Sequence, residues 1–127
     1  MRGFFMGKKF NLSKDEILNK VLKNHKAIAD VTDMLLRTNK VKLDEPIGVT
    51  TQLALFSTKF DLDYNSAHLA IEQVKDTYLQ ELLTSELRNY ERLCDSITSN
   101  DSTQIKDIAI ELVLAIKGIE DYFEEKM

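Results

Sequence analysis

The sequence predicts an all-α protein, folded as an antiparallel four-helix bundle. The 127 residues include only four Gly and one Pro, so few positions interrupt long helices. Apolar residues also recur at helical spacing along most of the chain. A chain of this length is most simply one domain, and we expect a helical bundle over 13–127 after a flexible N-terminal tail of residues 1–12.

The segment 105–123 predicts the central helix of this bundle. Its main apolar residues lie 4, 3, 4, 3 and 4 residues apart: Ile105, Ala109, Leu112, Ile116, Ile119 and Phe123. Ile110, Val113 and Leu114 extend the apolar surface around a second side. A helix that is apolar on most sides is normally surrounded by other helices or by a second copy of the protein. We therefore predict an interaction surface at Ile110, Val113 and Leu114, where Val113→Asp or Leu114→Asp should separate binding from folding.

Two stretches earlier in the chain also predict helices. The first covers about 13–37 and begins with a capping box formed by Ser13 and Glu16. The second covers 49–60, and a strand is the alternative for it. Its apolar residues follow a spacing of 4, 3 and 4: Val49, Leu53, Phe56 and Phe60.

A longer helix is expected over 66–98. It carries two apolar stripes that are offset around the helix axis. The helix therefore either changes neighbours midway along a continuous length of roughly 50 Å or bends near Thr84 and Ser85, whose hydroxyls can bond the preceding carbonyls. A continuous helix would be longer than the bundle needs, which favours a dimer. Within the last helix, Gly118 is expected to allow a close helix crossing.

The net charge of −4 is unevenly distributed along the chain. Residues 1–42 contain ten Lys/Arg and four Asp/Glu, and residues 43–127 contain seven Lys/Arg and seventeen Asp/Glu. A basic first helix could pack beside the acidic later ones, or Lys20, Lys23 and Lys26 could form a surface for nucleic acid. The acidic remainder of the chain favours the first interpretation, so we expect no nucleic-acid partner.

The single cysteine and the absence of long apolar runs indicate a cytoplasmic protein. Cys94 cannot form an intramolecular disulfide, and its helical context favours a structural, half-buried thiol. No apolar run approaches the roughly 20 residues that span a bilayer, and we expect no membrane partner.

The pattern in residues 61–72 resembles the spacing of calcium ligands in an EF-hand loop. Asp61, Asp63, Asn65 and Glu72 occupy positions 1, 3, 5 and 12. Ser66 stands where such a loop normally has Gly. The alternative is that Asp63 or Asn65 caps a helix and Glu72 is a surface charge, and we favour this alternative.

No arrangement typical of an enzyme is present in the sequence. His25 and His68 lie on different elements, without a zinc-binding or triad spacing around them, and there is no Gly-rich phosphate loop. His25 falls within the apolar stripe of the first helix, where a hydrogen-bonded or edge-exposed histidine is expected. We predict a non-enzymatic protein that needs no cofactor.

The expected function is therefore protein–protein interaction, as a small regulatory or accessory factor. The partner would be another protein or a second copy of this chain. Bacterial or phage-encoded factors of this size offer an analogy at the level of fold class alone. A calcium module at 61–72 and a nucleic-acid-binding regulator are the alternatives.

Overall fold

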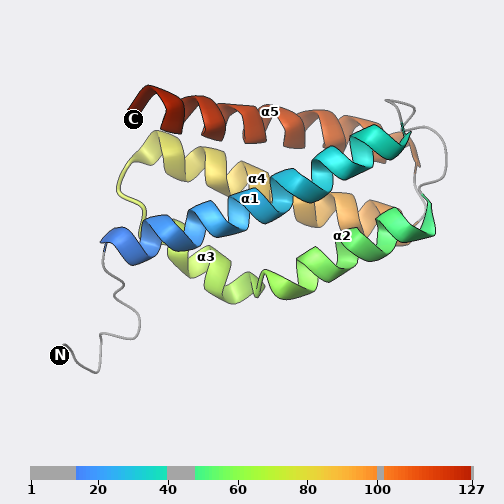
Figure 1. Cartoon of the computed structure of the whole chain (residues 1–127), viewed down its shortest axis with the longest axis horizontal. Coiled ribbons are helices and arrows are strands. Elements are labelled where there is room, and N and C mark those ends of the chain that lie inside the picture. Colours follow the sequence, from blue (N-terminus) through green and yellow to red (C-terminus); the bar gives the residue numbers. More distant parts are fainter. Residues whose placement is uncertain (1–13, 40–47, 100–101, 127) are drawn as a thin grey trace.

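The computed structural model describes residues 14–39, 48–99 and 102–126, which form five α-helices (Figure 1). These are α1 Lys14–Asn39, α2 Val49–Asp61, α3 Tyr64–Glu72, α4 Thr77–Ser99 and α5 Ser102–Lys126. The all-α prediction is confirmed, with no strand in these ranges, but the number of helices is five rather than four. The predicted tail and the capping residue Ser13 lie outside the described residues.

Helices α1 and α4 lie in the middle of the molecule. Helix α5 packs on one side of them, and α2 and α3 pack on the other (Figure 1). Helices α4 and α5 form an antiparallel hairpin, since Arg92 near the end of α4 pairs with Glu111 near the start of α5. At the opposite end of the hairpin, the Tyr122 hydroxyl of α5 donates a 2.7 Å hydrogen bond to Asp76, just before α4. None of the described helices combines the length and the apolar character needed to cross a membrane.

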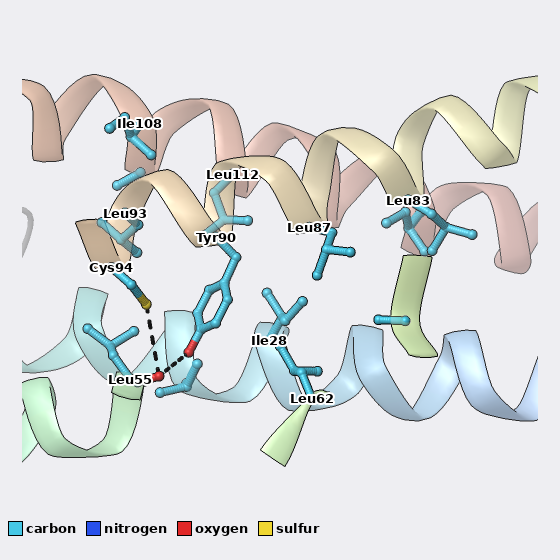
Figure 2. Packing of buried hydrophobic residues seen from close by; sticks show 14 of the residues in the cluster. Ile28, Leu55, Leu62, Leu83, Leu87, Tyr90, Leu93, Cys94, Ile108 and Leu112 are labelled. Atoms are coloured by element: carbon cyan, nitrogen blue, oxygen red, sulfur yellow. Dashed lines mark hydrogen bonds between the residues drawn. The ribbon is translucent and has the colours of Figure 1, made fainter. Parts of the chain in front are cut away.

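The core is built from one side of each helix. Figure 2 shows Ile28 of α1, Leu55 of α2, Tyr90 of α4 and Leu112 of α5 converging on the same interior. All four side chains are fully buried. Burial of each large apolar side chain stabilises the fold by about 1.5–3 kcal/mol relative to exposure, so the shared interior fixes the mutual arrangement of these helices.

The predicted continuous helix over 66–98 is wrong, because the chain leaves helical geometry between α3 and α4. Asp76 ends this link by accepting hydrogen bonds from the backbone N–H groups of Tyr78 (3.0 Å) and Leu79 (3.2 Å), which caps the start of α4. The Gln80 side chain in turn donates to the carbonyl oxygens of Ile71 (3.2 Å) and Glu72 (3.3 Å) at the end of α3. The residues of the predicted helix are therefore divided between two helices.

The alternative to a continuous helix, a bend at Thr84 and Ser85, is also absent. Helix α4 continues through both residues. The Thr84 hydroxyl does bond the carbonyl oxygen of Gln80, at 2.8 Å, as a helical threonine can. This local bond is accommodated without a break because α4 is packed against α5 along its length.

Gly118 of α5 lies in close contact with the Leu82 side chain of α4. A Cβ atom at residue 118 would lie 2.8 Å from Leu82 Cδ2. Real Cβ contacts are essentially never that short. Any larger residue at this position therefore requires the Leu82 side chain to move.

A double-mutant cycle tests this contact. In a Leu82→Ala background, Gly118→Ala should raise the free energy of unfolding by about 1 kcal/mol, because alanine favours a helix interior over glycine. In the wild-type background the gain should be smaller, because displacing Leu82 offsets it. Urea unfolding of the four proteins measures the difference, and equal effects in both backgrounds would contradict the contact.

Candidate interaction surface

The orientation of α2 about its own axis is set by a buried hydrogen bond from α4. The Tyr90 hydroxyl donates to the Leu55 carbonyl oxygen, and the Cys94 sulfur lies 4.0 Å from the same oxygen (Figure 2). Tyr90 is fully buried, and a buried hydroxyl needs a partner. This contact places Leu55 and Thr51, both buried, on the inner side of α2.

The opposite side of α2 exposes most of its apolar stripe. Val49 is 71% exposed, Leu53 64% and Phe60 87%, while Phe56 is half-buried against the core. An apolar stripe at helical spacing normally faces a core, and the spacing read from the sequence is present. Because Thr51 and Leu55 occupy the inner side, the stripe faces outward. We call Val49, Leu53, Phe56 and Phe60 the outer α2 stripe.

The outer α2 stripe lies on a helix that is almost free of charge. Residues 49–58 contain no charged side chain, although 30% of the chain is charged. Lys59 is directed to α4, where it pairs with Asp95 at 3.6 Å. A ten-residue uncharged stretch with apolar residues on two sides is the sequence signal that could have identified this surface.

The predicted surface on α5 is smaller and divided. Ile110 is 49% exposed and Leu114 63%, but Val113 is half-buried. Val113→Asp would therefore disturb packing as well as any contact, whereas Leu114→Asp changes an exposed position. The α5 and α2 surfaces belong to helices on opposite sides of α1 and α4 (Figure 1).

The residues of the EF-hand pattern lie on helices and on a two-residue junction between them. Asp61 ends α2, Asp63 precedes α3 with a left-handed backbone (φ 49°), and Asn65 and Glu72 are in α3. An EF-hand loop needs an open turn over the stretch that forms α3 here. Asp63 is one of the few residue types that tolerate such a φ, and it stands at the N-cap position of α3 without a side-chain capping bond. Among the described residues, no three His, Cys, Asp or Glu side chains gather to hold a metal.

A histidine–glutamate pair is the main polar feature of the interior. His25 Nδ1 of α1 lies 2.7 Å from Glu86 Oε2 of α4, and the two residues are only 8% and 2% exposed. Glu120 of α5 approaches the other ring nitrogen at 3.8 Å. Glu86 also lines a cavity of about 10 Å³, which is at most enough for a single water molecule. The pair thus connects three helices, and the cavity beside it is too small for a substrate.

The surroundings of this pair raise both of its pKa values. Burial alone would lower the pKa of His25, but the hydrogen bond and charge of Glu86, with the charges of Glu120 and Asp30, outweigh burial and raise it. Burial raises the pKa of the Glu86 carboxyl, against the opposing effect of His25. The folded protein therefore holds protons at this pair more tightly than the unfolded chain does.

The remaining candidate groups contribute no reactive centre. Burial raises the pKa of the Cys94 thiol to about 11, so the thiol is protonated at neutral pH and is a poor nucleophile. Of the three lysines in the nucleic-acid hypothesis, Lys23 and Lys26 are exposed on α1 and Lys20 is half-buried.

Comparison of the chain with protein-family models, with curated proteins and with solved structures finds no match in any of the three. The functional argument therefore depends on the surfaces and side chains described above.

The His25–Glu86 pair predicts how stability changes with pH. The pKa of His25 is higher in the folded protein than in the unfolded chain. Its contribution to the free energy of unfolding is therefore fully present below the unfolded pKa of about 6.5 and is lost as the pH rises through the folded pKa. The raised pKa of Glu86 acts in the same direction. The free energy of unfolding should therefore decrease as the pH rises above about 6.5, and this decrease should be reduced in the double variant His25→Gln/Glu86→Gln, which removes both titrating groups.

Urea unfolding at a series of pH values measures this effect. His68→Gln, at an exposed position of α3, is the matched control and should retain the wild-type profile. Parallel pH profiles for the wild type and the double variant would show that the pair is not the source of the pH dependence.

Proposed function

We propose that this protein is a non-enzymatic binding module that docks a partner protein on the outer α2 stripe. The observation that supports this most directly is the exposure of Val49, Leu53 and Phe60, between 64% and 87%, on one side of a single helix. Exposed apolar patches of this kind mark protein-interaction sites. The spacing of the stripe is also that of residues which anchor one helix against another.

The interior chemistry supports a binding role over catalysis. The acidic and basic groups that burial perturbs, His25 and Glu86, satisfy each other at 2.7 Å. The cavity beside them holds about one water at most. A general acid or base must instead reach a substrate proton within hydrogen-bonding distance.

The exposed pair Ile110 and Leu114 on α5 is a second, smaller candidate surface. Two apolar side chains at i and i+4 offer less contact area than the four residues of the outer α2 stripe. We therefore assign the principal contact to α2, and α5 to a secondary one. By analogy of size and fold class, a regulatory or accessory role in the cytoplasm is the process that we propose.

Affinity capture with matched variants tests this proposal. The bait proteins are the wild type, a Leu53→Lys/Phe60→Lys variant of α2 and an Ile110→Lys/Leu114→Lys variant of α5. All four positions are exposed, so thermal unfolding should show each variant to be folded. We expect the α2 variant to lose at least about tenfold of the captured partner, because central apolar anchors carry most of the binding energy.

The α5 variant serves as the control for added charge. It introduces the same two lysines on the other side of the molecule and should retain most of the partner. Equal capture by the wild type and the α2 variant would argue against the proposed function.

A further inference from the structure

We propose that the partner of the outer α2 stripe is a second copy of this chain, with the two α2 helices packed antiparallel about a twofold axis. This inference rests on the proposed role of the stripe and names its occupant. It follows from the spacing of the stripe, from its lack of charge and from the two ends of α2.

The spacing of the outer α2 stripe is the same in both directions. Its residues lie at 49, 53, 56 and 60, so the intervals are 4, 3 and 4. An antiparallel copy therefore places Val49 opposite the partner's Phe60, and Leu53 opposite the partner's Phe56. Each contact sets an aliphatic side chain against an aromatic ring, which lets the two surfaces interdigitate. The three intervals average about 3.7 residues, close to the 3.6-residue repeat of an α-helix, so the stripe stays on one side of α2.

The charges of α2 complement an antiparallel copy. The helix begins after Gly48, has no capping side chain there and has no acidic residue in its first turn. The position related to Gly48 by the same symmetry is Asp61, which is exposed at the end of α2. The carboxylate of the partner's Asp61 would therefore lie at the positive end of the α2 dipole, where negative charge is favourable. The twofold axis produces this contact twice.

The lack of charged side chains along the outer α2 stripe also explains why two copies can meet at this surface. Each copy has a net charge of −4, so most approaches would bring like charges together. The exposed residues of α2 beside the stripe are Thr50, Ser57 and Asp61, and only Asp61, at the end of the helix, is charged. A charged partner helix would instead place ionised groups against Leu53 and Phe60, and these ionised groups would lose their hydration.

Sedimentation of charge variants at residue 53 tests the proposed dimer. Leu53 and the partner's Leu53 lie about one helical turn apart across the axis, or roughly 4–5 Å along it. Leu53→Lys and Leu53→Glu should each be monomeric at concentrations where the wild type dimerises, and an equal mixture of the two should associate again. Leu18→Lys, at an exposed position of α1, is the matched control and should dimerise like the wild type.

Cysteine pairing tests the antiparallel direction. Val49→Cys and Phe60→Cys proteins, once mixed, should form a disulfide-linked dimer on mild oxidation. Val49→Cys alone should not, because its two copies lie roughly 16 Å apart along the axis. Cys94 will not interfere, because it is buried and its thiol pKa is about 11.

Three results would overturn the inference, and they separate it from the proposed function. A wild-type chain that stays monomeric at millimolar concentration excludes the dimer. If that monomer still captures a partner through Leu53 and Phe60, the binding role stands, and if it captures none, both proposals fail. A dimer that is unaffected by Leu53→Lys, or that is linked by Val49→Cys alone, excludes the antiparallel α2 contact.

Discussion

The hydrogen bond from the Tyr90 hydroxyl to the Leu55 carbonyl oxygen sets which surface this protein presents. Tyr90 is fully buried at the centre of α4, and its hydroxyl reaches across the interior to the backbone of α2 (Figure 2). Rotating α2 by a third of a turn would move the Leu55 carbonyl oxygen away from that hydroxyl and expose the fully buried Leu55 side chain, at a cost of about 1.5–3 kcal/mol. The bond therefore holds Leu55 inward, and the outer α2 stripe faces solvent as a consequence.

A second polar contact fixes the position of α1 against the α4–α5 hairpin. Pairing His25 with Glu86 in the interior adds little net stability, because both groups lose their hydration. Sliding α1 by one turn would nevertheless leave the Glu86 carboxylate buried without its partner, which is far more costly. The pair thus acts mainly by disfavouring alternative registers of the helices, while apolar burial supplies most of the stability.

The sequence predicted the helices better than it predicted their faces and boundaries. Helical spacing located α1, α2 and α5. Cys94 is fully buried rather than half-buried as expected, and Gly118 contacts the Leu82 side chain. The break before α4 was missed because residues 73–76 contain neither Gly nor Pro. The two helix ends are instead defined by side-chain bonds: Gln80 donates to a carbonyl oxygen at the end of α3, and Asp76 accepts from the first backbone N–H groups of α4. The outward face of α2 was missed because both of its sides are apolar, and spacing alone does not say which side a neighbouring helix covers.

The fold does not account for the residues of the outer α2 stripe. Lys or Glu at position 53 or 60 would favour a helix as well as Leu does, and better than Phe. These side chains are so exposed that the change would remove little buried apolar area. Leu53 and Phe60 therefore contribute little to the stability of the monomer and increase its tendency to associate. A surface of this kind is explained by a contact that covers it. Because the spacing is symmetric and the ends of α2 are complementary, the α2 helix of a second copy is the simplest partner for this surface.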